Sequence, residues 1–505
     1  MSCETLYSLL QQAAAVHGTR TAIDFDGRCI TYLELLDASD RLAGLLADLG
    51  AAPGRRVAFC FHKSIDALMA LFAIIRTGAT YVPLDPTWPD DRLRTICQDA
   101  EAVFWVGSSP PTQPGGFDAV IVTDPEHGDA VPLARWRTRE PSGWPAATPA
   151  HGIANILYTS GSTGRPKGVQ ITAESLLHFS DWVVGEFSLG PDDRLANHAP
   201  YHSDLSTLDI FAAVRAGAAM CPVPERARMF PYLMARFICE QRITIWYSVP
   251  SALIMMRRRG ALADHNVSPL RHVIFAGEVM PKTELQAIAR EWPHVSLTNL
   301  YGPTETNVCT YFHVDPAELL RDSPIPIGRH IRGARLWAVN EHEQPINNGQ
   351  AGELWVAGPT VTQGYWGDAA LTAQQLVPAP DGNGQAYRTG DRVQRRADGE
   401  WMFEGRIDRM IKCRGHRIEP GEIEVVLQRH PDIREAAVVP VPDPVFGNLI
   451  KACVVPRDGR STRESVLAAF CRKHLPDHMV PDIWQTHEDL PRTDRGKVDY
   501  HALLE

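Results

Sequence analysis

Short apolar runs of strand length alternate with amphipathic helical patterns through most of the chain. A helical pattern over residues 32–49 places leucines near one face and stops at Gly50. A second helix, almost wholly apolar, is expected to begin after Ser64 and to end near Gly78. Strands are predicted for residues 57–61, 119–122, 153–158, 272–275 and 296–300. This alternation predicts an α/β body with largely parallel sheets.

The pattern changes in two places. Residues 108–150 are rich in proline and glycine, which indicates an excursion over the surface. After Gly405, helices are expected at 420–430 and 463–474, and strands at 434–441 and 450–455. These four elements predict a separate small α+β domain of about a hundred residues.

Composition narrows the class of protein. The chain has 505 residues, 44% of them hydrophobic and 22% charged, as in ordinary soluble globular proteins. A formal net charge of −10 argues against nucleic-acid binding, which needs a basic surface. No signal peptide begins the chain, and the longest apolar run, 67–75, is too short to span a bilayer. Ten scattered cysteines without zinc-like spacing favour a reducing cytoplasm.

Two histidines could suggest a metal site, His198 and His202. Pro200 lies between them, so they do not share a regular helical turn, and structural roles are expected.

The most distinctive segment reads Tyr158-Thr-Ser-Gly-Ser-Thr-Gly-Arg-Pro-Lys-Gly168 and directly follows a predicted strand. Glycines and hydroxyl groups after a strand offer N–H and O–H donors to a polyphosphate, and Lys167 adds a positive charge. A Walker loop needs G-x-x-x-x-G-K-[ST], and Pro166 and Gly168 occupy the wrong places. A P-loop kinase is therefore excluded. The segment is either an ordinary flexible turn or a phosphate loop of another kind.

This loop resembles the signature of the adenylate-forming superfamily, which includes acyl-CoA synthetases, luciferases and the adenylation domains of nonribosomal peptide synthetases. Further motifs of that family occur in the expected order, both before and after this loop, from about residue 30 to the C-terminus. They include Asn299-Leu-Tyr-Gly-Pro-Thr-Glu305, Tyr387-Arg-Thr-Gly-Asp391, Arg414-Gly-His-Arg-Ile-Glu419 and Thr493-Asp-Arg-Gly-Lys497. One such motif could arise by chance, but the ordered set could hardly do so.

The resemblance implies a fold and a division into domains. An N-terminal adenylation core at residues 1–407 would hold α/β subdomains with mostly parallel sheets and a small β-barrel-like part. A mobile α+β domain would follow at 408–505, with its hinge at Asp408.

The resemblance also implies ATP and Mg²⁺ as cofactors and assigns residues to them. Lys497, Glu305 and Lys167 are the implied catalytic residues, and Glu305 is the implied ligand of the metal, since hard cations prefer carboxylate oxygens. Tyr301 and Phe403 are expected to flank adenine. The ATP-binding residues implied by the resemblance are Thr159, Ser160, Gly161, Ser162, Thr163, Gly164, Asn299, Tyr301, Gly302, Thr304, Asp391, Phe403 and Arg406.

The implied acid is an amino acid. Asp204 matches the family aspartate that holds the substrate ammonium, although Ser203 stands where phenylalanine is usual. An anionic aspartate beside an apolar pocket needs a cation to neutralise it. The implied pocket lining resembles that of stand-alone L-prolyl–carrier-protein ligases of pyrrole natural-product pathways. L-proline is therefore the first candidate for the substrate. The implied lining residues are Asp204, Leu205, Leu208, Tyr247, Ile274, Ala276, Leu300, Val308 and Cys309.

The acceptor is expected to be a separate carrier protein bearing phosphopantetheine, because the chain ends eight residues after Lys497 with no carrier segment. Coenzyme A is the alternative acceptor. Two further readings stay open at this stage: an acyl- or aryl-CoA synthetase, disfavoured by Asp204, and a catalytically inactive ligand-binding homologue. Retention of Glu305, Asp391, Arg406 and Lys497 disfavours the inactive homologue.

Overall fold

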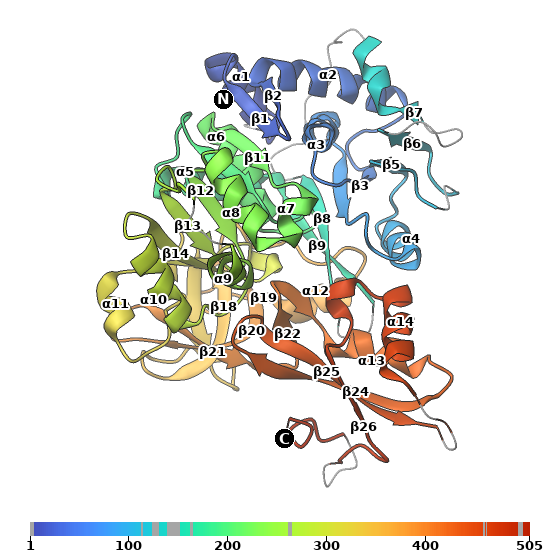
Figure 1. Cartoon of the computed structure of the whole chain (residues 1–505), viewed down its shortest axis with the longest axis vertical. Helices are drawn as coiled ribbons and strands as arrows, with labels where there is room; N and C mark the ends of the chain where they lie inside the picture. The colour runs from blue at the N-terminus through green and yellow to red at the C-terminus, as the bar shows by residue number, and fades with distance from the viewer. Residues whose placement is uncertain are drawn as a thin grey trace.

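The computed structural model of the chain describes residues 5–112, 115–123, 131–138, 152–161, 165–260, 265–457, 460, 462–492 and 498–504. Figure 1 shows a large body built from the N-terminal four-fifths of the chain and a smaller unit beneath it. No helix in these ranges is both long and apolar enough to cross a membrane.

One sheet of the large body has the order β7-β6-β5-β3-β4-β8-β9 among the described residues and is parallel except for the last pair. Its strands are β3 (Arg56–Cys60), β4 (Thr80–Leu84), β5 (Phe104–Gly107), β6 (Ala119–Val122), β7 (Val131–Pro132), β8 (Ile153–Thr159) and β9 (Lys167–Thr172). The helices α2 (Tyr32–Asp48), α3 (Ile65–Thr77) and α4 (Asp90–Asp99) accompany it.

The second sheet of the large body has the order β16-β15-β14-β13-β12-β10-β11-β1-β2 among the described residues, and its central strands are parallel. Its strands are β1 (Thr21–Phe25), β2 (Arg28–Thr31), β10 (Arg194–Asn197), β11 (Ala219–Pro222), β12 (Ile245–Ser248), β13 (His272–Phe275), β14 (Ser296–Tyr301), β15 (Thr310–His313) and β16 (Arg329–His330). Its helices are α1 (Ser8–His17), α5 (Ala173–Glu186), a π-helix (Leu208–Ala212), α6 (Ala213–Ala216), α7 (Glu225–Met229), α8 (Pro231–Glu240), α9 (Pro250–Arg259), α10 (Lys282–Glu291) and α11 (Pro316–Leu320).

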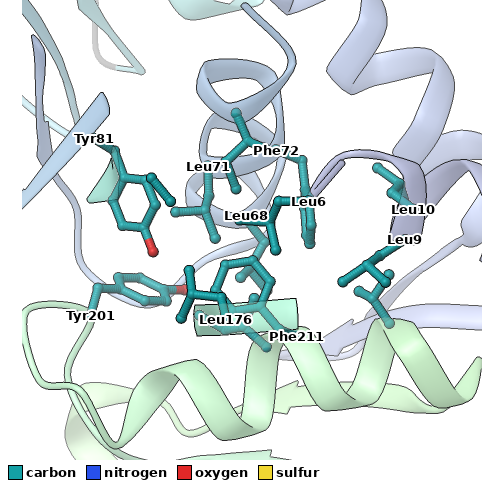
Figure 2. Packing of buried hydrophobic residues seen from close by; sticks show 14 of the residues in the cluster. Leu6, Leu9, Leu10, Leu68, Leu71, Phe72, Tyr81, Leu176, Tyr201 and Phe211 are labelled. Atoms are coloured by element: carbon teal, nitrogen blue, oxygen red, sulfur yellow. The ribbon is translucent and has the colours of Figure 1, made fainter. Parts of the chain in front are cut away.

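The two sheets share one core, in which helices of both pack together. Leu68 and Phe72 of α3 lie against Leu176 of α5 and Phe211 of the π-helix (Figure 2). The rings of Phe72 and Phe211 meet edge to face, with centroids 6.4 Å apart. Burial of these apolar side chains fixes the carboxyl ends of the two parallel sheets relative to each other.

An antiparallel sheet follows, corresponding to the expected β-barrel-like part. Its strands are β17 (Arg335–Val339), β18 (Ala351–Ala357), β19 (Leu376–Pro378), β20 (Gln385–Arg395) and β21 (Trp401–Arg406), with α12 (Ala369–Gln375) beside them. The long strand β20 pairs with β18, β19 and β21. It carries Asp391 toward the large sheets.

The small unit begins with the hairpin of β22 (Ile411–Cys413) and β23 (His416–Ile418). A three-stranded sheet follows, with α13 (Pro420–Gln428) and α14 (Glu464–His474) on one face and strands β24 (Ile433–Asp443), β25 (Gly447–Pro456) and β26 (Ile483–Thr486). Ala436 and Val438 of β24 pack toward α13, whereas Ala437 and Val439 face the other side.

Most predicted elements are confirmed, including both helix ends signalled by Ser64 and Gly78. The Ser64 hydroxyl accepts from the Ala67 N–H, and Gly78 adopts φ 79°, a left-handed cap. The expected excursion at 108–150 is only partly a surface loop, because β6 and β7 within it join the sheet edge and bury Ile121 and Val122. The domain boundary after residue 407 stays a prediction.

Candidate functional site

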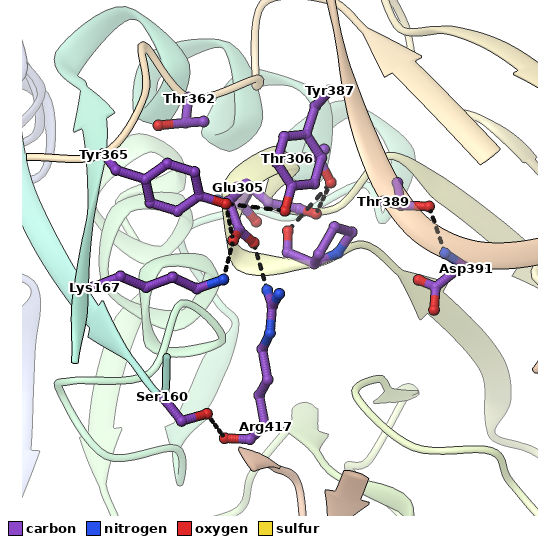
Figure 3. A network of polar contacts seen from close by, with 12 residues as sticks. Ser160, Lys167, Glu305, Thr306, Thr362, Tyr365, Tyr387, Thr389, Asp391 and Arg417 are labelled. Carbon is purple, nitrogen blue, oxygen red and sulfur yellow. Dashed lines mark hydrogen bonds and ion pairs between the residues drawn. The ribbon is translucent and has the colours of Figure 1, made fainter. Parts of the chain in front are cut away.

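Glu305 is the centre of a buried polar network (Figure 3). It lies on the 3-10 turn Thr304–Thr306 that follows β14, with no exposed surface. Oε1 accepts a hydrogen bond from the Tyr365 hydroxyl at 2.7 Å and lies 3.6 Å from the Lys167 ammonium. Oε2 accepts from Nη1 of Arg417 at 2.7 Å.

The charge of Glu305 is set by these neighbours. Burial alone would raise the pKa of its carboxyl, but Arg417, Lys167 and the Tyr365 hydroxyl together hold that pKa well below its ordinary value. Glu305 is therefore a carboxylate in this arrangement. Lys167 has a pKa lowered by burial and by the neighbouring Arg417 guanidinium, although Glu305 opposes that shift.

The glycine-rich loop lies at the end of β8, next to this network. Cβ of any residue replacing Gly161 would lie 2.0 Å from the Arg165 carbonyl oxygen, so the turn requires glycine. The hydroxyl of Thr159 is buried without a hydrogen-bond partner among the described residues. Such an orphaned donor is typical of a ligand-binding loop. The predicted ATP ligands Ser162, Thr163 and Gly164 lie outside the described residues.

Ser160 of this loop contacts the small unit in this arrangement. Its hydroxyl donates to the carbonyl oxygen of Arg417 at 2.7 Å and accepts from the Glu419 N–H at 3.2 Å. The β22–β23 hairpin is thus fixed against the phosphate loop through its backbone as well as through Arg417.

Asp391 of β20 forms a second buried centre. Its Oδ1 accepts from Nη1 of Arg406 at 2.8 Å, and its Oδ2 accepts from the hydroxyl of Tyr301. The rings of Tyr301 and Phe403 lie 6.3 Å apart. The structure therefore brings these four predicted nucleotide ligands together.

Asn299, Gly302 and Thr304 belong to the same strand end and turn. The Asn299 amide donates to the Pro326 carbonyl oxygen at 2.8 Å. A Cβ at Gly302 would lie 1.6 Å from the Asn307 carbonyl oxygen, so the turn closes too tightly for a side chain there. Thr304 lines the cavity next to Asp204.

The predicted amino-acid pocket is a cavity of about 60 Å³ between Asp204 and Asp391. Five predicted residues line it: Asp204, Leu205, Tyr247, Ala276 and Val308. Leu208, Ile274 and Leu300 are fully buried in the core that continues behind these residues. Cys309 is also buried, but it packs in the neighbouring group with Tyr301.

Asp204 is the only acidic group of the implied pocket lining. Its Oδ1 accepts from the Leu205 N–H at 2.9 Å, and no ion pair to it is formed by the described residues. Burial raises the pKa of its carboxyl, while hydrogen bonds from Thr304 and from the Leu205 N–H, together with the Lys412 ammonium, oppose that rise. A cation inside the cavity would remove the cost of this buried charge.

A second cavity, of about 180 Å³, runs from Asp204 between the large body and the small unit. The large body contributes Trp88, Tyr158, His198, His202, Ser203 and Arg228, and the small unit contributes Arg414, Gly415, His416, His478 and Met479. The rings of His416 and His478 are stacked at 3.7 Å. His198 and His202 line this cavity and pack against Trp246 and Trp88, and their expected structural roles stay a prediction.

Sequence reasoning missed the groups that the small unit brings to the site. Arg417 reaches Glu305, and the Lys412 ammonium lies 5.5 Å from the ring centroid of Tyr301 and 5.8 Å from that of Phe403. One signal was available: Lys412 is a lone charge between the apolar Ile411 and Cys413 of a short strand.

Lys497 lies outside the described residues. The residues flanking its segment are described: Arg492 pairs with Val498, and Leu490 packs on Ala437 and Cys453. That face of β24 and β25 is opposite the face that carries α13 and the hairpin. In Figure 1 the C-terminus accordingly lies at the bottom, away from β8 and β9.

Comparison with known proteins gives consistent matches. The family model described as "AMP-binding enzyme" matches residues 10–366, and that described as "AMP-binding enzyme C-terminal domain" matches residues 422–497. The chain is 37% identical over 99% of its length to a protein of Pseudomonas fluorescens named L-proline–[L-prolyl-carrier protein] ligase, 98% of which is covered. A protein of the same name from Streptomyces coelicolor is 38% identical over 98% of this chain and 95% of its own length. The structure of amide bond synthetase McbA from Marinactinospora thermotolerans matches with a TM-score of 0.89 and 26% identity, over 99% of both chains.

Proposed function

Since this chain belongs to the family of AMP-binding enzymes, we propose that it activates L-proline and loads it onto a carrier protein. ATP and proline would give prolyl-adenylate and pyrophosphate. The phosphopantetheine thiol of the carrier would then take the prolyl group and release AMP. Two relatives with that printed name, similar over nearly the whole chain, support this proposal.

The observation that carries it is the unpaired carboxylate of Asp204. It lines a cavity together with the apolar side chains of Leu205, Tyr247, Ala276 and Val308. None of the described residues forms an ion pair with it, although the Lys412 ammonium lines the same cavity. An amino acid supplies the missing cation, whereas a plain organic acid does not. This disfavours the acyl- or aryl-CoA synthetase alternative.

The pocket also limits the side chain of the substrate. Its volume of about 60 Å³ and the apolar side chains of Leu205, Tyr247, Ala276 and Val308 suit a small, uncharged amino acid side chain. The charged groups of Asp391, Arg406, Lys412 and Arg417 line the rest of the cavity. Proline fits both limits. One methylene in such a pocket discriminates by only about 1–3 kcal/mol, so neighbouring small amino acids should be used weakly.

In the first step a carboxylate oxygen of proline attacks the α-phosphorus of ATP, and the bond to the β-phosphate breaks. Lys167 and the loop after β8 would bind the phosphates, and Lys497 would orient the carboxylate and the α-phosphate. Asp391 would accept hydrogen bonds from the ribose hydroxyls once its hydrogen bonds with Tyr301 and Arg406 are broken.

Glu305 fits the metal implied by the family. A buried carboxylate that stays ionised is a suitable ligand for Mg²⁺, which is usually bound by one or two carboxylates and substrate phosphates. The described residues contain no group of three or more histidine, cysteine, aspartate or glutamate side chains that could hold a metal ion. Bound Mg²⁺ would neutralise phosphate charge.

In the second step the thiol sulfur attacks the acyl carbon, AMP leaves with the bonding electrons, and the thiol proton passes to solvent. The channel of about 180 Å³ that ends at Asp204 supports this step, because it gives a long arm a route between the two parts. Here the Arg417 guanidinium is hydrogen-bonded to the Glu305 carboxylate, which would otherwise be free to bind the metal. This arrangement suits a stage of the reaction after pyrophosphate has left.

The test is ATP–pyrophosphate exchange with each of the twenty amino acids, benzoate and acetate. We expect the highest rate with L-proline and no exchange with benzoate or acetate. Exchange supported only by acids without an amino group would contradict the proposal, and so would a maximum for a charged or large aromatic amino acid.

A cytoplasmic location and a role in pyrrole-forming antibiotic biosynthesis belong to the same proposal.

A further inference from the structure

Three large apolar side chains are exposed together where α7 ends and α8 begins. Met229 is 69% exposed, Phe230 53% and Tyr232 49%. The other exposed large apolar residues of the described ranges are isolated in the sequence, such as Val279 and Leu320. Exposed apolar groups that gather in this way mark interaction sites more often than single ones do. Met229, Phe230 and Tyr232 are named the α7–α8 corner below.

The corner is held rigidly by the residues between and beside its members. Ala227, Met234 and Ala235 are buried in the core beneath it. Pro231 starts α8, and the N–H groups of Leu233 and Met234 donate to the Phe230 carbonyl oxygen at 2.9 and 3.1 Å. The exposed side chains therefore lose little backbone freedom when something binds them.

The corner adjoins the channel to the active site. Arg228, directly before Met229, lines the channel of about 180 Å³ that reaches Asp204. It also lines a neighbouring cavity of about 180 Å³ with Thr87 and Glu225. Its guanidinium is paired with Glu225 at 2.8 Å, and its Nε is buried without a hydrogen-bond partner among the described residues.

We propose that the α7–α8 corner is the docking surface for the carrier protein, with Arg228 beside the path of its phosphopantetheine arm. This inference rests on the proposed function, which requires a protein-bound thiol to reach Asp204. A protein whose arm enters the channel must rest on the surface that surrounds the entrance. The corner offers methionine, phenylalanine and tyrosine beside arginine, the residue types enriched at interface centres.

The anionic arm also fits this position. Phosphopantetheine carries a phosphodiester, and the side chain of Arg228 lines the channel. Free pantetheine would enter the same channel without touching the corner. The corner should therefore matter for a carrier and not for a small thiol.

The test compares two thiols on the same enzyme. The holo L-prolyl-carrier protein of the Pseudomonas fluorescens relative and free pantetheine are each supplied with proline and ATP. Met229→Asp and the double variant M229D/F230D are compared with the wild type. Leu320→Asp, at a position 87% exposed on α11, is the matched control. Thermal unfolding checks that every variant is folded.

We expect both corner variants to lower kcat/KM for the carrier by about tenfold or more, as loss of a central interface residue does. Pyrophosphate exchange and transfer to pantetheine should stay within about twofold of the wild type, and L320D should change nothing. The single variant keeps the test valid if the double variant unfolds.

Three results would overturn the docking proposal: equal loading by wild type and M229D, equal loss with pantetheine and carrier, or a wild type with no preference for the carrier over pantetheine. A dimer that the corner variants convert to monomers with loading intact would instead identify an interface between two copies. Failure of proline-dependent exchange in the wild type would contradict the proposed function itself.

Discussion

At the scale of single residues, the carboxylates of Glu305 and Asp204 have opposite surroundings. Glu305 is neutralised by Arg417 and Lys167. Asp204 is half-buried and forms no ion pair among the described residues, although the Lys412 ammonium lines the same cavity. A buried charge without a partner is unfavourable unless a ligand completes it. We therefore propose that Asp204 binds the amino acid and that Glu305 acts on the nucleotide.

Replacing Asp204 with alanine should mainly raise the KM for proline. Loss of one partner of a buried charge pair costs about 2–5 kcal/mol, which is a factor of tens to thousands in affinity. The KM for ATP should change far less, because Asp204 lies on the amino-acid side of the cavity. Steady-state kinetics with each substrate varied in turn would measure both effects. Unchanged proline kinetics would show that Asp204 does not contact the substrate.

Lys497 should separate the two half-reactions. A lysine between the carboxylate and the α-phosphate stabilises charge that develops during adenylation, and loss of one such donor costs about 10²–10³ in rate. Lys497→Ala should lose adenylation to that extent and keep transfer from supplied prolyl-adenylate to the carrier. Both steps are measured on one folded preparation. An equal loss in both steps would refute the assigned role.

At the scale of secondary-structure elements, local sequence signals predicted the helices and strands, but they did not predict the contacts between distant segments. Ser64 and Gly78 determine the ends of α3 through their own backbone and side chain, so the sequence predicted that helix well. The strand before the phosphate loop and the strand that carries Asn299 were also predicted. They lie in different sheets, and Lys167 of β9 meets Glu305 of the turn after β14 at 3.6 Å.

The part that could not be predicted depends on which face of the small unit is turned to the site. Arg417 and Glu305 are 112 residues apart in the chain, and their contact depends on the orientation of a whole hairpin. No local pattern encodes such an orientation. The same reason explains why His416 and His478 were not assigned to the channel.

The link between β21 and β22 is expected to be the hinge that lets the small unit change its orientation between the two half-reactions. Asp408 follows Arg406 there and accepts hydrogen bonds from its guanidinium, one at 2.8 Å. Proline fixes φ near −65°, so Asp408→Pro should hold one orientation of the small unit. We expect thioester formation to fall more than adenylation. Rapid-quench assays of each step on the folded variant and the wild type would detect the difference. Equal loss of both steps in a folded variant would contradict a hinge here.

At the scale of the whole molecule, the two parts meet through histidines that burial keeps neutral. Burial lowers the pKa of His416 to about 3 and that of His202 to about 4, and Arg92, Arg228 and Arg414 add to the effect while Asp85 opposes it. These folded-state values lie below the ordinary value near 6.5. The unfolded chain therefore binds more protons between about pH 6.5 and pH 4, and stability must fall as the pH falls through that range.

This predicts a measurable pH dependence of unfolding. Between pH 6.5 and 5, each such histidine contributes a slope of up to about 1.4 kcal/mol per pH unit. His416→Gln should reduce the slope, whereas His342→Gln, at a side chain 78% exposed, should not. Urea unfolding at several pH values would give the slopes. A slope unchanged by His416→Gln would show that His416 does not take up a proton when the protein unfolds in this pH range.

The central claim is that one chain both selects proline and delivers it to a protein thiol. It is tested most directly by incubating the enzyme with ATP, an equimolar mixture of the twenty amino acids and a holo L-prolyl-carrier protein. The intact mass of the carrier is then measured. We predict a single new species whose mass corresponds to the prolyl thioester, absent without ATP and absent with the apo carrier. A carrier loaded mainly with another amino acid, or left unloaded while adenylate accumulates, would contradict the account.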